Sequence, residues 1–292
     1  MLEGRTLWEL IERRAAETPA AEMAVDEDGR RITFAEYAAD VEQAAAGLAA
    51  MGLGEDDVVS WQLPTWIESL VLVGALGRLG ITQNPILPIY RKREVGFVAR
   101  QAGTKLLVVP STWKGFDFEA MAREVADEVD GLEVLVCDRT LPQGDPATLP
   151  PAPPTPDDPD DLPVRWLFYT SGTTADPKGA RHTDATIAAI GRGMGQRYEV
   201  VPEDRGAMVF PFTHIGGITW LLTGLMFGSA SIMVEAFDPS TTIGVLAAEG
   251  VTLAGAGTPF HMAYLAAQRA NPDTPLFPNV RALPGGGAPK PK

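Results

Sequence analysis

The chain has 292 residues, of which 24 are lysine or arginine and 38 are aspartate or glutamate, so its formal net charge at pH 7 is −14. This acidic balance argues against a nucleic-acid-binding protein, which would carry a basic surface stripe. A single cysteine, Cys137, excludes an intrachain disulfide, and the charged amino terminus lacks the apolar core of a signal peptide. The sequence therefore predicts a globular protein of the reducing cytoplasm.

Helices and strands are predicted to alternate along the first 141 residues. Hydrophobic periodicity and helix-stop signals predict helices at residues 6–18, 34–51, 66–79, 93–102 and 118–129. Short apolar runs predict strands at residues 21–25, 58–63, 81–84, 105–109 and 133–138. Thr33 and Glu36 have the spacing of a capping box at the start of the second helix. The alternation predicts βαβ units and a mainly parallel sheet, which we assign to a first α/β subdomain at residues 1–141.

The next segment, residues 142–163, changes to proline, aspartate, alanine and threonine, with P-P-A-P-P-T-P-D-D-P-D-D at its centre. Such a composition predicts an extended, solvated connector rather than a packed element. We assign no chemistry to it.

Residues 164–179 combine a predicted strand with a polar loop. Val164 to Tyr169 is apolar and aromatic except for one arginine, as expected for a strand that enters a core. Thr170 to Gly179 is dense in glycine, serine and threonine, a composition that suits phosphate oxygens because glycines let the backbone approach closely while hydroxyl and N–H groups donate. Lys178 adds a positive charge, and Thr183 or Asp184 is expected to cap the helix that follows.

Beyond the loop, the alternation continues to the end of the chain and predicts a second α/β subdomain at residues 164–292. Helices are predicted at residues 186–197, 218–226, 239–249 and 259–269, and strands at residues 205–210, 231–234, 252–256 and 280–283. Residues 206–234 contain no formally charged side chain, but Pro211 and several glycines favour strand, loop, helix and strand over a transmembrane helix. The three histidines and one cysteine are too far apart for a zinc site, and His261 is assigned a structural role.

The polar loop and the tyrosine before it resemble the signature of a known protein family. Tyr169 to Gly179, Y-T-S-G-T-T-A-D-P-K-G, resembles the signature loop of the adenylate-forming superfamily, which includes acyl-CoA synthetases, firefly luciferase and the adenylation domains of non-ribosomal peptide synthetases. Ala175 stands where the family usually has glycine, and the spacing differs from that of the Walker A loop. The resemblance implies the α/β fold of the family's N-terminal domain, with two mainly parallel βαβ-type sheets and helices between and around them. The family's C-terminal domain is expected to be absent from this sequence.

The resemblance also implies three groups of site residues. For the phosphates of ATP and for Mg²⁺ it implies Thr170, Ser171, Gly172, Thr173, Thr174, Lys178 and Gly179, with Lys178 and Thr170 catalytic and Thr170 at the metal. For the adenine and acyl groups it implies the backbone of Gly286, Gly287, Ala288 and Pro289. For the carboxylic acid it implies His214, Gly216, Gly217, Thr258 and Pro259.

The function implied is that of an ATP-dependent acyl-CoA synthetase, which joins a carboxylic acid to CoA through an acyl-adenylate and releases AMP and pyrophosphate. The family's magnesium-binding Y-G-x-T-E motif, hinge and C-terminal lysine do not occur in this sequence. We therefore expect the N-terminal portion of such an enzyme, incomplete for turnover. Two alternatives remain open at this point: an adenylating domain that loads a carrier protein, and a non-catalytic nucleotide- or acyl-binding module. The expected partners are small molecules, and a homodimer is left open.

Overall fold

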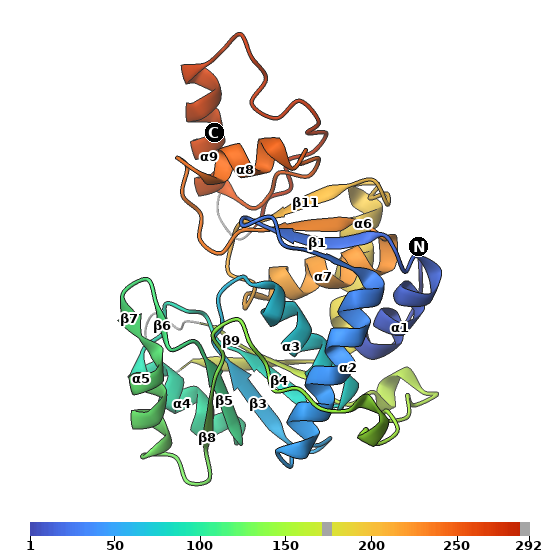
Figure 1. The fold of residues 1–292 in the computed structure, drawn as a ribbon, viewed down its shortest axis with the longest axis vertical. Helices are drawn as coiled ribbons and strands as arrows, with labels where there is room; N and C mark the ends of the chain where they lie inside the picture. Colours follow the sequence, from blue (N-terminus) through green and yellow to red (C-terminus); the bar gives the residue numbers. More distant parts are fainter. Residues whose placement is uncertain (171–176, 287–292) are drawn as a thin grey trace.

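The computed structural model describes residues 1–170 and 177–286, and in these residues two sheets lie on either side of a layer of helices (Figure 1). The larger sheet has six strands in the order β10-β9-β4-β3-β5-β8. These strands are β3 (Val58–Trp61), β4 (Thr82–Pro85), β5 (Leu106–Val109), β8 (Glu133–Val136), β9 (Trp166–Thr170) and β10 (Lys178–His182). Every neighbouring pair is parallel except β9 and β10.

The smaller sheet has four strands in the order β11-β12-β1-β2. These strands are β1 (Glu22–Asp26), β2 (Arg31–Thr33), β11 (Arg205–Met208) and β12 (Ala230–Met233). The β1–β12 and β11–β12 pairs are parallel, and β2 is antiparallel to β1. The predicted class, α/β with two mainly parallel sheets, is confirmed.

Each of the two sheets contains strands from both of the subdomains predicted at residues 1–141 and 164–292. Strands β9 and β10 come from the second predicted subdomain but extend the six-stranded sheet. Strands β1 and β2 come from the first but join β11 and β12, with Ala24 opposite Ser231. The alternation of helices and strands did not reveal this exchange, because local patterns identify a strand but not the strand beside it.

The described residues contain nine α-helices. They are α1 (Leu7–Glu17), α2 (Phe34–Ala50), α3 (Ile67–Arg78), α4 (Lys92–Ala102), α5 (Phe118–Ala126), α6 (Asp184–Arg197), α7 (Ile215–Phe227), α8 (Thr242–Ala248) and α9 (Thr258–Ala270). Helices α4 and α5 pack on the outer face of the six-stranded sheet, and α8 and α9 lie beyond the four-stranded sheet (Figure 1).

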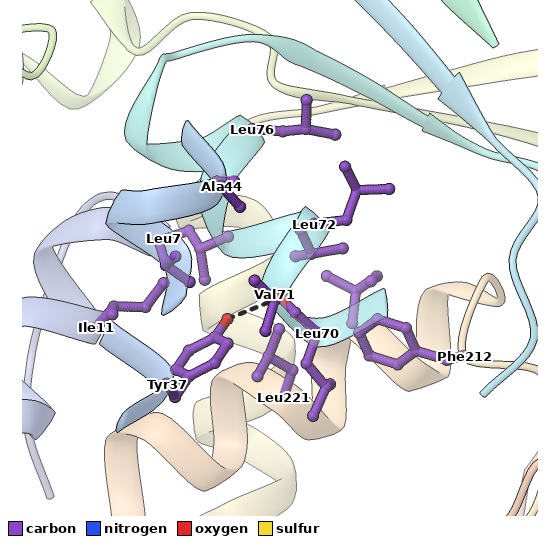
Figure 2. Close-up of a cluster of buried hydrophobic side chains, with 14 of the residues drawn as sticks. Leu7, Ile11, Tyr37, Ala44, Leu70, Val71, Leu72, Leu76, Phe212 and Leu221 are labelled. Carbon is purple, nitrogen blue, oxygen red and sulfur yellow. Dashed lines mark hydrogen bonds between the residues drawn. The ribbon is translucent and has the colours of Figure 1, made fainter. Parts of the chain in front are cut away.

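The main core lies in the middle layer, where α1, α2, α3 and α7 meet between the two sheets. Figure 2 shows side chains of these helices in contact, with Tyr37 of α2 donating its hydroxyl to the carbonyl oxygen of Leu70 in α3 at 3.0 Å. The same cluster includes Trp61 of β3 and Met233 of β12, one from each sheet. The middle layer therefore joins the two sheets into one body, because it buries apolar side chains against both.

Four local features differ from the sequence predictions. In place of the strands predicted at residues 252–256 and 280–283, the chain forms isolated bridges, between Leu253 and Ala282 and between Ala256 and Gly285. Two short strands, β6 (Thr112–Trp113) and β7 (Phe116–Asp117), form a hairpin that was not predicted. Residues 178–182 form β10, although the sequence predicted a loop as far as Gly179 and no strand before the helix at residues 186–197.

The fourth difference is the connector at residues 142–163. The sequence predicted an extended, solvated segment, but the connector packs against the helices. It contains the 3₁₀ turns Pro146–Thr148 and Pro159–Asp161. A side-chain carbon at Gly47 of α2 would lie 2.5 Å from the carbonyl carbon of Pro142, so only glycine permits this approach. Arg78 donates to the carbonyl oxygen of Pro150 at 2.8 Å. Proline lacks an N–H group but keeps its carbonyl acceptor, and this arginine uses it.

No helix within the described ranges is long and apolar enough to cross a membrane. The uncharged segment at residues 206–234 contains β11, α7 and β12, as the sequence predicted.

Candidate functional site

The described ends of the glycine-rich segment belong to β9 and β10, which pair with each other. Thr170 ends β9 and stands opposite Lys178, the first residue of β10, while Tyr169 stands opposite Gly179. Lys178 is exposed. Residues 171–176 lie outside the described residues, so the phosphate-binding roles predicted for Ser171, Gly172, Thr173 and Thr174 stay predictions. The hairpin nevertheless brings the backbones of Thr170 and Lys178, the two predicted catalytic residues, side by side.

Gly179 lies against the ring of Tyr169. A side-chain carbon at Gly179 would lie 3.0 Å from Cζ of Tyr169 and 3.3 Å from two other ring carbons. The tyrosine ring thus lies over the glycine of the neighbouring strand, in the space that a larger residue would fill. Burial raises the pKa of the Tyr169 hydroxyl, so this group stays protonated at neutral pH.

His214 begins α7 as its N-cap residue. Its ring Nδ1 accepts the backbone N–H of Gly216 at 3.0 Å, and its ring meets Phe210 edge-on with centroids 6.4 Å apart. Desolvation by the surrounding protein lowers the pKa of His214 although part of the ring is exposed, which favours the neutral ring that the cap requires. Gly217 is buried, and a side-chain carbon there would lie 2.4 Å from the carbonyl oxygen of Phe212. Both predicted glycines therefore shape the turn that presents His214.

A cavity of about 100 Å³ lies between the end of β9 and the start of α7. Its described lining comprises Pro85, Ile86, Leu87, Tyr90, Val98, Phe168, Tyr169, Thr213, His214 and Ile215. Two predicted features of the site meet here, because Tyr169 belongs to the strand that precedes the glycine-rich loop and His214 belongs to the predicted acid pocket. Sequence analysis missed the residues from 85 to 98, since they lie far from both motifs along the chain.

The other described residues of the predicted site, Thr258, Pro259 and Gly286, lie together around the start of α9. Thr258 and Pro259 begin α9 after Gly257, and a side-chain carbon at Gly257 would lie 3.2 Å from the carbonyl oxygen of Gly286. His261 in the first turn of α9 approaches Gly285, and its Nε2 is buried with no hydrogen-bond partner among the described residues. These residues do not line the cavity beside His214. Gly287, Ala288 and Pro289 lie outside the described residues, and their predicted adenine and acyl contacts stay predictions.

The two places lie along the same edge of the four-stranded sheet. Leu253 bridges in parallel to Gly206 of β11 and to Ala282, and Ala256 bridges in parallel to Gly285. His214 follows the carboxyl end of β11. Thr258 and Gly286 follow the carboxyl ends of the two bridged segments. Carboxyl ends of parallel strands are the usual location of ligand sites in open α/β sheets.

The described residues contain no cluster of three or more histidine, cysteine, aspartate or glutamate side chains with metal-binding geometry. The predicted role of Thr170 at Mg²⁺ stays a prediction. A threonine hydroxyl is an oxygen donor of the type that Mg²⁺ takes, and Mg²⁺ commonly receives its other ligands from substrate phosphates and water.

Comparison with known proteins places the chain in a family. Residues 11–292 match the family described as AMP-binding enzyme. The chain is 32% identical over 242 residues to a sulfoacetate–CoA ligase of Cupriavidus necator, an alignment that covers 80% of this chain and 46% of the relative. It is 26% identical over 291 residues to a long-chain-fatty-acid–CoA ligase of Mycobacterium tuberculosis, covering 97% of this chain and 55% of the relative.

A solved structure shares the fold of this chain. A solved structure of a Mycobacterium tuberculosis fatty acyl CoA synthetase superimposes with a TM-score of 0.84 at 23% sequence identity, covering 98% of this chain and 56% of that one. The chain thus spans about half the length of the proteins it matches. On the family match over residues 11–292, and with the signature hairpin and sheet order described above, the chain belongs to the AMP-binding enzymes of the adenylate-forming superfamily.

Proposed function

We propose that this chain is the N-terminal portion of an ATP-dependent acid–CoA ligase that acts through an acyl-adenylate. The β9–β10 hairpin carries the proposal: it sets Lys178 opposite Thr170, and the adjacent Tyr169 lines a cavity that His214 also lines. In this proposal, the residues that would bind phosphate and the residues that would bind the acid begin one residue apart on the same strand. The family match and the names of the relatives as CoA ligases support the reaction class.

In the proposed reaction, a carboxylate oxygen of the acid attacks the α-phosphorus of ATP, and pyrophosphate leaves. A carboxylate is already a charged nucleophile, so the protein contributes mainly position and charge neutralisation. The ammonium group of Lys178 would offset the negative charge that develops on the departing pyrophosphate. Thr170 to Thr174 would hold the β- and γ-phosphates, and bound Mg²⁺ would neutralise part of their charge.

In the second step, a thiol takes the acyl group and AMP leaves. We propose CoA as this thiol because the relatives named above are CoA ligases. A carrier protein is the alternative acceptor, because the signature loop also resembles that of the adenylation domains of non-ribosomal peptide synthetases. Adding CoA or a phosphopantetheinyl carrier protein to the preformed acyl-adenylate separates the two. The buried free thiol of Cys137 supports the cytoplasm as the site of action.

Replacing Lys178 with alanine in the complete protein tests the first step. We expect acid-dependent exchange between ATP and pyrophosphate to fall by about 10²-fold or more, because a charge that stabilises the transition state is commonly worth that much. Exchange of labelled pyrophosphate into ATP measures it, over a panel of carboxylic acids.

Arg181→Ala is the matched control, since Arg181 is an exposed cation on the same strand, three residues further on. Its exchange rate should stay within about twofold of the unmodified protein. Equal rates in the Lys178→Ala variant and the unmodified protein would reject the role of Lys178. Failure of every acid to support exchange in the unmodified complete protein would favour a non-catalytic binding module.

A further inference from the structure

A buried carboxylate joins β11 to the two bridged segments, residues 252–256 and residues 280–285. The carboxylate belongs to Asp204, which directly precedes β11 and is 2% exposed. Its Oδ1 accepts hydrogen bonds from the hydroxyl of Thr252 at 2.7 Å and from Nε of Arg281 at 2.8 Å. Its Oδ2 accepts a second guanidinium N–H of Arg281. One side chain therefore fixes the starts of three neighbouring segments relative to one another along the strand direction.

The ion pair between Asp204 and Arg281 is reinforced on both sides. The guanidinium of Arg281 also donates to the carbonyl oxygens of Tyr198 at 2.7 Å and Glu199 at 3.0 Å. Burial by itself would raise the pKa of Asp204, but the hydrogen bonds from Arg281 and Thr252 lower it below the ordinary value of an aspartate, so the carboxylate is ionised at neutral pH. Charge-assisted bonds of this two-pronged kind are stronger than bonds between neutral groups.

The backbone pairing between the two bridged segments is sparse by comparison. The N–H groups of Arg281 and Ala282 both donate to the carbonyl oxygen of Thr252, at 2.9 Å and 3.3 Å. The N–H of Ala254 donates to the carbonyl oxygen of Ala282 at 3.1 Å. Both segments also contain glycine, and glycine-rich strands specify their register weakly. A strong side-chain contact at the start of the pairing therefore has a large influence on its register.

The register decides what lies at the other end of the two segments. Ala256 bridges to Gly285, and the carbonyl oxygen of Gly286 lies 3.2 Å from the position of a side-chain carbon at Gly257. The ring of His261 packs against Gly285, because a side-chain carbon at Gly285 would lie 2.9 Å from Cε1 of the ring. A slip of one residue would move Gly285 and Gly286 away from these neighbours.

We propose that Asp204 and Arg281 are positioning residues for nucleotide binding, because their ion pair fixes the register that presents the backbone of Gly286 beside the start of α9. This inference rests on the proposed function, in which Gly286 borders the adenine of ATP. Neither Asp204 nor Arg281 contacts the nucleotide. They act on a population: molecules with another register lack the binding surface, and the apparent affinity for ATP falls in proportion to their number.

Replacing Arg281 with glutamine in the complete protein tests the inference. We expect the KM for ATP in acid-dependent ATP–pyrophosphate exchange to rise about tenfold, as it would if about one molecule in ten kept the register. At saturating ATP, kcat should stay within about twofold, since ATP draws the molecules back into the competent register. Partial unfolding has the opposite signature, because it lowers kcat and leaves the KM of the folded molecules unchanged.

Three further variants complete the series. Arg281→Lys keeps the charge without the two-pronged contact, so its KM for ATP should lie between the values of Arg281→Gln and the unmodified protein. The double variant with Asp204→Asn should have the KM of the poorer single variant, because the two residues act through one contact. Arg31→Gln is the matched control: Arg31 forms ion pairs with Glu22 and Glu249 of the same region, and its loss should leave the KM for ATP within about twofold.

Hydrogen exchange measures the pairing itself, without any substrate. In Arg281→Gln, the N–H of Ala254, which is bonded to Ala282, should exchange faster than in the unmodified protein. The N–H of Ala207, which is bonded to Leu253 on the side facing β11, should keep its protection.

Several results would overturn the inference while leaving the proposed function intact. An unchanged KM for ATP in Arg281→Gln would do so, with or without faster exchange at Ala254. A fall in kcat alone would assign the ion pair to stability and not to nucleotide binding. Absence of ATP–pyrophosphate exchange with every acid in the unmodified protein would reject the proposed function, and the positioning role with it.

Discussion

His214 caps α7 and also lines the cavity beside β9. The unprotonated Nδ1 accepts the N–H of Gly216, and protonation would place two N–H donors against each other. The pKa of His214 is lowered by desolvation, so the folded protein binds this proton less readily than the unfolded chain. The contribution of the neutral ring to the free energy of unfolding is therefore complete above about pH 6.5, and it is lost as the pH falls through the lower pKa of the folded state.

We predict that His214→Asn makes the free energy of unfolding less dependent on pH between about pH 7 and pH 5. Asparagine caps helices well without titrating, so stability at pH 7.5 should be nearly retained. His214→Ala removes the cap and should cost about 1 kcal/mol at pH 7.5. Urea unfolding at several pH values measures all three proteins, and an identical slope with pH in His214→Asn would contradict the assignment.

Helix α7 depends on a glycine at its contact with the preceding turn. A side-chain carbon at Gly217 would lie 2.4 Å from the carbonyl oxygen and 2.8 Å from Cα of Phe212, and backbone atoms cannot rotate away as a flexible side chain can. We predict that Gly217→Ala lowers the free energy of unfolding by about 1–3 kcal/mol. Because the start of α7 must move, binding of the acid should weaken as well.

The control for this prediction is Gly193 in α6. A side-chain carbon there meets no atom within 4 Å, so Gly193→Ala should raise the free energy of unfolding by about 0.5–1 kcal/mol through improved helix propensity. Urea unfolding of both variants separates steric crowding from propensity. Stabilisation by Gly217→Ala would show that the turn at Phe212 adapts.

At the scale of the molecule, a single carboxylate joins segments that are far apart in the chain. Glu235, just after β12, accepts the indole N–H groups of Trp66 at 2.6 Å and Trp113 at 2.5 Å. It also accepts a guanidinium N–H of Arg139 at 2.7 Å. Trp66 precedes α3, and Trp113 and Arg139 follow β5 and β8 of the six-stranded sheet. Glu235 is thus a polar link between the two sheets, beside the apolar middle layer.

We predict that Glu235→Gln lowers the free energy of unfolding by about 1–3 kcal/mol, because an amide replaces one acceptor oxygen with a donor that faces other donors. Unfolding in urea, followed by tryptophan fluorescence, measures it. The control Glu119→Gln removes a surface ion pair with Arg123. The side chain of Glu119 is 36% exposed and that of Arg123 is 62% exposed, so the substitution should lower the free energy of unfolding by at most about 0.5 kcal/mol. Equal losses in the two variants would show that the link at Glu235 contributes no more than a surface pair.

Local signals predicted the features that depend on neighbouring residues. The capping box at Thr33 is confirmed: its N–H donates to Glu36 Oε2 at 2.8 Å, and the N–H of Glu36 donates to its Oγ1 at 3.2 Å. Thr183 caps α6 by accepting the N–H of Thr186 at 3.2 Å, as one of the two predicted caps. The bridged segments at residues 252–256 and 280–283 were located correctly, but their pairing is too sparse for strands.

The sequence by itself determined the α/β class, most helices and strands, and the family, because periodicity, caps and the run from Tyr169 to Gly179 are read within a few residues. Only the tertiary structure decided which sheet each strand joins and which residues line the cavity beside Thr213 and His214. The physical reason is distance along the chain. Pairing, burial and cavity shape depend on residues brought together from distant positions, such as Ala24 and Ser231 in neighbouring strands, and local patterns carry no record of those contacts.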